Sequence, residues 1–297
     1  MKQSGYACAY GAGTIINAIA TWKGAAFGID LKTEAEVILT EPKKITGYME
    51  EGGNTSLIER CVELTLLRFG SNYGAKVSTK SEIPIASGLK SSSAAANAVV
   101  LATLDALGEK LPPLEAIKLG VQAALDSKVT ITGAFDDACA SMLGGFVVTD
   151  NKKNELIKRE ERDSGVLILA PEKKVLSSAT NVARSRLIGR WVELAYNEAL
   201  AGNYEKAMTL NGFLYCSALG FSTEPMMAAL EVGIEGVSLS GTGPAYTALG
   251  NSELLDKLEP VWRRMGGKVI RTKVINTPYS ETPYLNTGTN TGARTCR

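Results

Sequence analysis

A turn that leads into three consecutive serines is the part of this chain whose residue types best suit a charged ligand. Its residues are Pro84, Ile85, Ala86, Ser87, Gly88, Leu89, Lys90, Ser91, Ser92, Ser93 and Ala94. Glycine permits a positive φ and close approach to the backbone, and the start of a helix presents unpaired N–H groups at the positive end of its dipole. The segment therefore predicts a cradle for nucleotide phosphates. It lacks the Walker A spacing, and a serine N-cap on a core helix is the alternative interpretation.

Phosphoryl transfer is the chemistry that such a cradle would serve. The reaction needs a triphosphate that is held in place and has its charge neutralised, usually by Mg²⁺. We expect the backbone of residues 88–92 to hold the phosphates, and the Ser92 hydroxyl to offer a hard oxygen to the ion. Lys90 would add a positive charge beside a phosphate, unless it is a solvated loop lysine.

Two adjacent carboxylates, Asp136 and Asp137, follow a glycine turn and precede an apolar stretch with helical spacing. Carboxylates at the mouth of an apolar helix are costly unless they are paired or bound to something. One of them would accept the proton of a hydroxyl that attacks a phosphoryl group. We expect Asp137 to do so, with Asp136 as a possible substitute. The alternative is that an aspartate here only caps the helix.

A second glycine turn contains Gly241, Thr242 and Gly243 and follows a short strand-like segment. Beside the serine turn it would form another wall against a phosphate or an acceptor, although Gly-x-Gly turns are also common without ligands. Arg186 belongs to a basic cluster over residues 184–190. An arginine there would clamp a substrate carboxylate through two hydrogen bonds. A solvated basic face is the alternative.

The composition excludes several classes of protein. The 297 residues include no histidine, which removes Ser-His-Asp and Cys-His catalysis and histidine metal ligands. With 32 basic and 31 acidic side chains, the chain lacks the charge of a nucleic-acid-binding protein. No apolar stretch is long enough to span a bilayer, and polar residues interrupt the alanine-rich residues 6–27. We therefore expect a cytoplasmic protein with a small-molecule substrate and no membrane or obligate protein partner.

Local patterns predict the elements that must position these residues. Helices are expected over residues 56–69, 92–107, 114–125, 187–200, 204–220, 225–233 and 254–265. Strands are expected over residues 25–31, 37–40, 45–49, 75–83, 144–148, 165–170, 237–249 and 268–275. Charged residues separate two halves, and we place domains at residues 1–160 and 161–277. Residues 278–297 have few apolar side chains and are expected to form a flexible tail.

The three motifs, in this order, resemble those of the GHMP small-molecule kinase superfamily. Residues 84–95 are similar to its Pro-x-x-x-Gly-Leu-Gly-Ser-Ser-Ala-Ala phosphate motif. Residues 137–145 resemble the segment whose aspartate faces the acceptor hydroxyl, and residues 240–244 resemble the third, glycine-rich motif. The Gly-Leu-Lys-Ser-Ser-Ser form of the first motif and the run over residues 131–137 are similar to the archaeal-type shikimate kinases within that superfamily. The resemblance covers residues 1–276.

This resemblance implies an α+β fold of two domains, with an N-terminal ATP-binding half like ribosomal protein S5 and a C-terminal ferredoxin-like half. It implies transfer of the γ-phosphate of ATP to a shikimate hydroxyl, and another small acceptor such as homoserine is the alternative. A nucleotide- or sugar-binding module without catalysis is a third possibility.

The resemblance also implies roles for single residues. Ser92 and Asp126 correspond to the magnesium pair of the superfamily. Several relatives carry a lysine in an early motif that assists the acceptor, and the matching residue here is Ala12. The proton of the acceptor hydroxyl would then pass to Asp137, or correct positioning of the two reactants would be enough for phosphoryl transfer.

Overall fold

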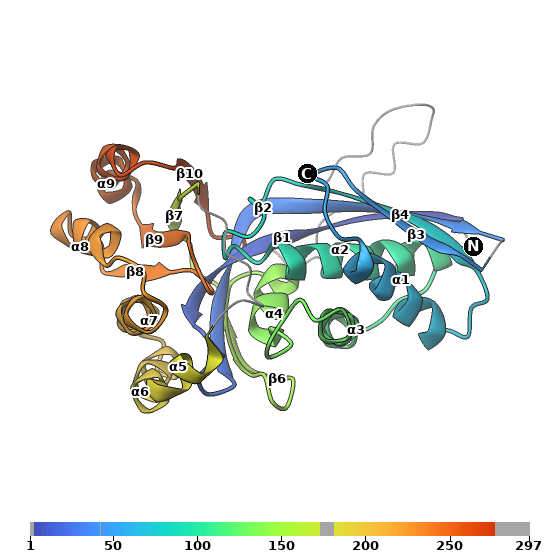
Figure 1. The fold of residues 1–297 in the computed structure, drawn as a ribbon, viewed down its shortest axis with the longest axis horizontal. Coiled ribbons are helices and arrows are strands. Elements are labelled where there is room, and N and C mark those ends of the chain that lie inside the picture. Colours follow the sequence, from blue (N-terminus) through green and yellow to red (C-terminus); the bar gives the residue numbers. More distant parts are fainter. Residues whose placement is uncertain (1–2, 42, 173–180, 277–297) are drawn as a thin grey trace.

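Two β-sheets, each covered by helices, follow one another along the chain in the computed structural model (Figure 1). The structure describes residues 3–41, 43–172 and 181–276. Helices and strands are mixed, and nearly all the strand pairs are antiparallel, so the predicted α+β class is confirmed. The predicted tail, residues 278–297, lies outside the described part of the chain.

Six strands form the first sheet, and the long second strand is its centre. They are β1 (Ser4–Ile16), β2 (Lys23–Thr40), β3 (Ile45–Met49), β4 (Gly74–Ser81), β5 (Phe146–Asp150) and β6 (Glu155–Glu160). β1 runs antiparallel along one edge of β2, and β4 and β5 share the other edge. β3 pairs with β4 in parallel, and β6 pairs with β5. The end of β1 reaches the helices of the second sheet (Figure 1).

Parts of this sheet differ from the sequence-based expectation. Residues 25–31 and 37–40 are not separate strands: both belong to β2, whose polar middle is held by strands on its two edges. The sequence does not predict β1, because alanine and glycine have low strand propensity. It does not predict β6 either, because the charged side chains of this edge strand resemble those of a loop.

Four helices cover one face of the first sheet (Figure 1). They are α1 (Ser56–Arg68), α2 (Ser91–Leu107), α3 (Pro113–Asp126) and α4 (Phe135–Leu143). α2 packs closely on β1, since a Cβ on Gly5 would lie only 2.1 Å from the carbonyl oxygen of Ala102. The small alanine side chains of α2 permit this approach. Close packing along the helix fixes the position of the serine turn at its N-terminus.

Four antiparallel strands form the second sheet, in the order β10-β7-β9-β8. They are β7 (Gly165–Ala170), β8 (Gly236–Leu239), β9 (Tyr246–Gly250) and β10 (Lys268–Lys273). The accompanying helices are α5 (Val182–Leu187), α6 (Gly189–Leu200), α7 (Tyr204–Leu219), α8 (Glu224–Glu231) and α9 (Ser252–Arg264). Helices between β7 and β8, a β8–β9 hairpin and a helix before β10 give the β-α-β-β-α-β succession of a ferredoxin-like unit, as the resemblance implies.

This half differs from the expectation at two places. The expected helix over residues 187–200 corresponds to α6, and the short α5, which ends at Leu187, was not predicted. The expected strand over residues 237–249 is a hairpin of β8 and β9, and its turn contains the second glycine motif. The chain passes from one sheet to the other between Glu160 and Gly165.

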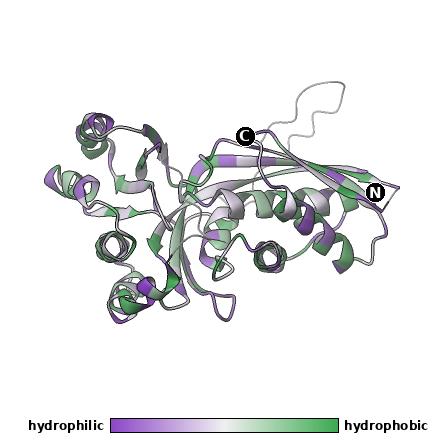
Figure 2. Ribbon diagram, viewed as in Figure 1, coloured by the Kyte–Doolittle hydropathy of each residue, from purple (hydrophilic) through white to green (hydrophobic). Residues whose placement is uncertain are grey.

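One hydrophobic core joins the two sheets. The rings of Phe27 and Phe146, from β2 and β5, stack with their centroids 5.6 Å apart, and Tyr204 of α7 lies 4.9 Å from Phe146. Hydrophilic residues lie outside this core, for example on the outer side of α9 (Figure 2). Within the described residues, no helix combines the length and apolar character needed to cross a membrane. The shared core holds the two halves in a fixed relation across the site.

Candidate active site

The serine turn joins β4 to α2 and leaves the start of that helix without a side-chain cap. Lys90 is the N-cap residue, with a left-handed backbone (φ 65°), and Gly88 has φ 87°. Within the described part of the chain, no side chain hydrogen-bonds to the first amides of α2, and the first turn of this helix contains no acidic residue. The serine N-cap interpretation is therefore wrong. The first turn instead offers its amides and hydroxyls to an anion.

The second glycine turn packs directly on the first. The Ser240 hydroxyl donates to the carbonyl oxygen of Gly88 at 2.9 Å, and the Ala245 amide donates to that of Ser87 at 3.0 Å. A Cβ on Gly88 would lie 2.1 Å from the carbonyl oxygen of Ser240. The contact between the two turns therefore requires glycine at position 88, for its positive φ and for its lack of a side chain.

The end of β1 ties both turns together. The Ala12 amide donates to the carbonyl oxygen of Leu89 at 3.2 Å, in the first turn. In the second turn, the Gly241 amide donates to the Thr14 hydroxyl at 2.7 Å. The side-chain amide of Asn17 donates to the carbonyl oxygen of Gly241 at 2.8 Å. β1 therefore fixes the spacing between two loops that are more than 150 residues apart in the sequence.

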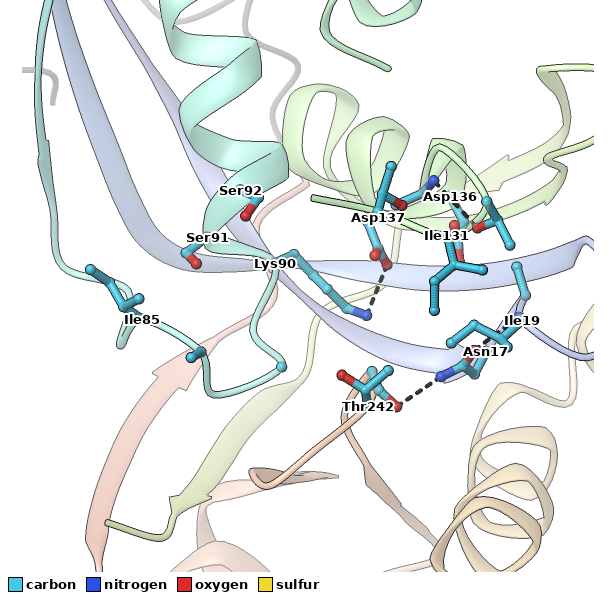
Figure 3. A pocket seen from close by; sticks show the side chains of 17 residues that line it. Asn17, Ile19, Ile85, Lys90, Ser91, Ser92, Ile131, Asp136, Asp137 and Thr242 are labelled. Carbon is cyan, nitrogen blue, oxygen red and sulfur yellow. Dashed lines mark hydrogen bonds and ion pairs between the residues drawn. The ribbon is translucent and has the colours of Figure 1, made fainter. Parts of the chain in front are cut away.

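A cavity of about 180 Å³ lies among these segments. Four segments line it: residues 17–19 just after β1, the serine turn, the loop that leads into α4 with the first turn of that helix, and the second glycine turn. Figure 3 shows Ile85, Ser91 and Ser92 on one side and the two aspartates on the other, and Lys90 extends between them. The cavity therefore has a side suited to phosphates and a side suited to an acceptor.

Asp137 faces this cavity from the first turn of α4. The N-cap of α4 is Ala134, with φ 51°, so neither aspartate caps the helix and that alternative is wrong. The Asp137 Oδ1 atom lies 3.0 Å from the Lys90 Nζ atom, and the two side chains are only 14% and 9% exposed. A carboxylate at a helix N-terminus is stabilised by the helix dipole. Asp137 is therefore held close to the end of the serine turn.

Asp136 is buried behind Asp137. The Asn151 side-chain amide donates to its Oδ1 atom at 2.7 Å, and the Thr149 hydroxyl donates to the Asn151 Oδ1 atom at 2.7 Å. Burial and, secondly, the neighbouring charge of Asp137 raise the pKa of Asp136 to about 7, although Lys90 and the Asn151 hydrogen bond oppose the rise. Asp136 supports this side of the cavity, and Asp137 presents the more accessible carboxylate.

Comparison with known proteins gives the family. Residues 56–145 match the family of GHMP kinases N terminal domains. The shikimate kinase of Methanosarcina mazei is 64% identical over 281 residues, which cover 93% of this chain and 96% of the relative. The chain belongs to the archaeal-type shikimate kinases of the GHMP superfamily. The shikimate kinase of Methanothermobacter thermautotrophicus is 42% identical over 272 residues, which cover 90% of this chain and 94% of the relative.

Solved structures of other GHMP kinases share the fold. The mevalonate kinase of Methanococcus jannaschii has a TM-score of 0.75 at 17% identity and covers 91% of this chain and 98% of its own. The homoserine kinase of Cytophaga hutchinsonii has a TM-score of 0.72 at 19% identity and covers 93% of this chain and 96% of its own. At such identities the likeness establishes the two-domain GHMP fold, as predicted, and leaves the acceptor open.

Asp126 and Arg186, both predicted for the site of this GHMP kinase, lie on segments that do not line the cavity. Asp126 ends α3, where its carboxylate accepts hydrogen bonds from Gln122 and Arg60 at 2.7 Å each. These bonds hold its pKa below the usual range. The structure therefore does not bring Asp126 to Ser92, because an arginine from α1 holds it on the surface. Arg186 is exposed on α5, likewise outside the lining of the cavity.

Sequence reasoning missed several residues that build the site of this GHMP kinase. Asn17 lines the cavity, Thr14 anchors the second glycine turn, and Asn151 holds Asp136. Asn17 could have been identified from the sequence, since it is a polar residue in an otherwise apolar stretch. Asn151 could not, because it lies in a polar turn, where asparagine is common without any functional role.

Proposed function

We propose that this protein transfers the γ-phosphate of ATP to a hydroxyl of shikimate and forms shikimate 3-phosphate. One observation supports it above the others: uncapped helix amides, serine hydroxyls and an accessible aspartate converge on a single cavity. The first group suits a triphosphate, and the aspartate suits a hydroxyl nucleophile. The relatives that are named shikimate kinase and are 55–64% identical over most of the chain favour shikimate as the acceptor.

The serine turn is the proposed phosphate site. The segment from Pro84 to Ala94 would wrap the phosphate chain, with the amides of the first turn of α2 and the hydroxyls of Ser91 and Ser92 as donors. Gly241, Thr242 and Gly243 would close the opposite wall, since the second glycine turn is hydrogen-bonded to the first. Backbone donors suit this task because they hold phosphate oxygens without adding mobile side chains.

Mg²⁺ is the proposed companion of the nucleotide. Among the described residues, no group of three or more histidine, cysteine, aspartate or glutamate side chains could hold a metal ion by itself. Mg²⁺ usually takes one or two protein oxygens and completes its shell with phosphate and water oxygens. The exposed Ser92 hydroxyl at the cavity mouth fits this need, whereas Asp126 is engaged elsewhere. The ion would neutralise charge between the β- and γ-phosphates.

Asp137 is the proposed proton acceptor. The acceptor hydroxyl oxygen would form a bond to the γ-phosphorus while the bond to the β–γ bridging oxygen breaks, and that electron pair leaves with ADP. The hydroxyl proton would pass to the Asp137 carboxylate. Positioning and charge stabilisation supply much of the acceleration in such reactions. The fixed β1 anchors and the buried Asp136 would keep both reactants in place.

An acceptor panel tests the proposed function. The purified protein is incubated with ATP and Mg²⁺ and with shikimate, homoserine or mevalonate in turn, and ADP release is measured. We expect release with shikimate alone, and ³¹P NMR should identify a phosphate monoester on it. Turnover with homoserine or mevalonate and none with shikimate would refute the acceptor. Binding of ATP without turnover on any hydroxylated acid would favour a non-catalytic module.

A further inference from the structure

Lys90 has an unusual position for a lysine in a surface loop. Its backbone is left-handed (φ 65°), a conformation that is unfavourable for a residue with a side chain. Its side chain crosses from the serine turn towards α4 (Figure 3) and is only 9% exposed. A lysine that served only to solvate the loop would extend into water.

The second glycine turn leaves room for this side chain. A Cβ on Gly241 would lie 2.9 Å from the Lys90 Nζ atom. The backbone of Gly241 is held on both sides, through its amide by Thr14 and through its carbonyl oxygen by Asn17. Three separate segments therefore shape the path that carries the ammonium group to Asp137.

The pair formed by Lys90 and Asp137 retains unused hydrogen-bonding capacity. The Nζ and Oδ1 atoms lie 3.0 Å apart as an ion pair, yet Asp137 Oδ1 has no hydrogen-bond partner in the described part of the protein. An ammonium group has three donors, and a nearly buried charge that is only partly satisfied is costly. Both groups line the cavity. A ligand that offers an anionic oxygen to Lys90 and a hydroxyl to Asp137 would satisfy them together.

The charges of the residues that line the cavity indicate that the anionic oxygen bound by Lys90 belongs to the γ-phosphate. Lys90 is the basic residue among those that line the cavity, beside the two carboxylates of Asp136 and Asp137. A triphosphate that enters would meet two acidic groups and one ammonium. Like charges a few ångströms apart repel strongly in a partly buried site, where the effective dielectric constant is well below that of water. A γ-phosphate close to Asp137 therefore needs the ammonium between them.

We propose that Lys90 is a catalytic residue that bridges Asp137 and the transferred phosphoryl group. The inference rests on the proposed phosphotransfer. As the acceptor oxygen bonds to the γ-phosphorus, the bond to the bridging oxygen breaks with its electrons on ADP, and the hydroxyl proton moves to Asp137. Throughout, the Lys90 ammonium stabilises the equatorial phosphoryl oxygens and holds the carboxylate towards the hydroxyl. The lysine itself gains and loses no proton.

Binding of a non-hydrolysable ATP analogue tests the bridge without any acceptor. Lys90→Met should weaken analogue binding about tenfold, because the phosphate loses a cationic partner. The decisive comparison uses Asp137→Asn as the background. A lysine that touches phosphate still matters there, so Lys90→Met should again weaken binding at least fivefold. A lysine that only shields Asp137 would have no effect in that background, and this result would overturn the proposal.

Kinetics supply the second readout. Lys90→Met should lower kcat about a hundredfold or more and change the acceptor KM less than threefold, and Lys90→Arg should recover part of the loss because it keeps the charge. Lys118→Met is the matched control: its ion pair with Glu115 has the same 3.0 Å distance but is about half exposed. It should leave kcat unchanged. An equal fall in both methionine variants would contradict the proposal.

Two other causes of a negative result, misfolding of a variant and a wrong acceptor, can be distinguished from a failure of the Lys90 proposal. Thermal unfolding of each variant identifies loss of structure, and Lys90→Gln replaces Lys90→Met if the apolar side chain prevents folding. If shikimate proves to be the wrong acceptor, binding of the ATP analogue still tests the role of Lys90. If shikimate is turned over but Lys90→Met does not weaken analogue binding in the Asp137→Asn background, the role of Lys90 is rejected and the proposed function stands.

Discussion

Replacement of Gly88 by alanine should separate the two glycine turns and damage nucleotide binding. The new Cβ would lie 2.1 Å from the Ser240 carbonyl oxygen, in a backbone with φ 87°. That separation is more than 1 Å below the roughly 3.5 Å at which non-bonded atoms pack best. Because the obstacle is backbone and not a flexible side chain, the turns must move apart.

The structure sets the size of this effect. Left-handed strain on alanine costs about 1 kcal/mol. Separation of the turns would also break the bonds from Ser240 Oγ to Gly88 and from the Ala245 amide to Ser87, each worth about 1 kcal/mol. We therefore expect a loss of about 3 kcal/mol in the free energy of unfolding. A displacement of about 1 Å at the phosphate site should lower kcat/KM about a hundredfold.

Gly108→Ala provides the matched control at the other end of α2. Gly108 has φ 73°, and a Cβ there would meet nothing within 4 Å, so that only the strain of about 1 kcal/mol remains. Urea unfolding and titration with an ATP analogue compare the two variants. Equal stability losses, or analogue affinity in Gly88→Ala equal to that of the unmutated protein, would refute the inferred contact between the turns.

Three further predictions concern the carboxylates. Asp137→Asn should lower kcat by about 10²–10⁴-fold without weakening ATP-analogue binding, since the proton acceptor is lost and a negative charge is removed; unchanged kcat would exclude Asp137 from the chemistry. Burial and the charge of Asp137 raise the pKa of Asp136 from its ordinary 3.8 to about 7, so the folded state retains a proton that the unfolded chain releases. Stability should therefore fall as pH rises from about 4 to about 7 and level off above, and Asp136→Asn should flatten the melting-temperature profile over that window; parallel profiles would contradict the inferred burial. Asp126→Asn should lower stability by less than about 1 kcal/mol, because the broken pair with Arg60 is partly exposed, and should leave the Mg²⁺ concentration for half-maximal rate unchanged. A large rise in that Mg²⁺ concentration would contradict this prediction and indicate that Asp126 is a metal ligand.

Local patterns predicted the parts of the fold that local forces determine. The helix after the serine turn follows from a run of serines and alanines, and α1 and α3 follow from apolar residues at helical spacing. Strand β1 was missed because its alanines and glycines pack well only when helices lie directly on them, as α2 does at Gly5. Tertiary contact, not propensity, makes those residues strands.

The sequence predicted the motifs that form the site but not the long-range contacts that hold them together. The serine turn, the aspartates and the second glycine turn line one cavity, as their chemistry suggested. The pairing of Lys90 with Asp137 spans 47 residues, and that of Asn17 with Gly241 spans 224. No local pattern encodes such pairings. Asp126 shows the converse, since the family resemblance implied that it shares a magnesium ion with Ser92, and Arg60 of α1 holds it elsewhere.

A crystal structure with a non-hydrolysable ATP analogue and Mg²⁺ addresses the phosphate site directly. Density for the β- and γ-phosphates should lie against the amides at the start of α2, with the γ-phosphate between the serine hydroxyls and Lys90. Phosphates bound in another groove, with residues 84–94 unchanged from the free protein, would contradict the proposed nucleotide site and the mechanism that depends on it.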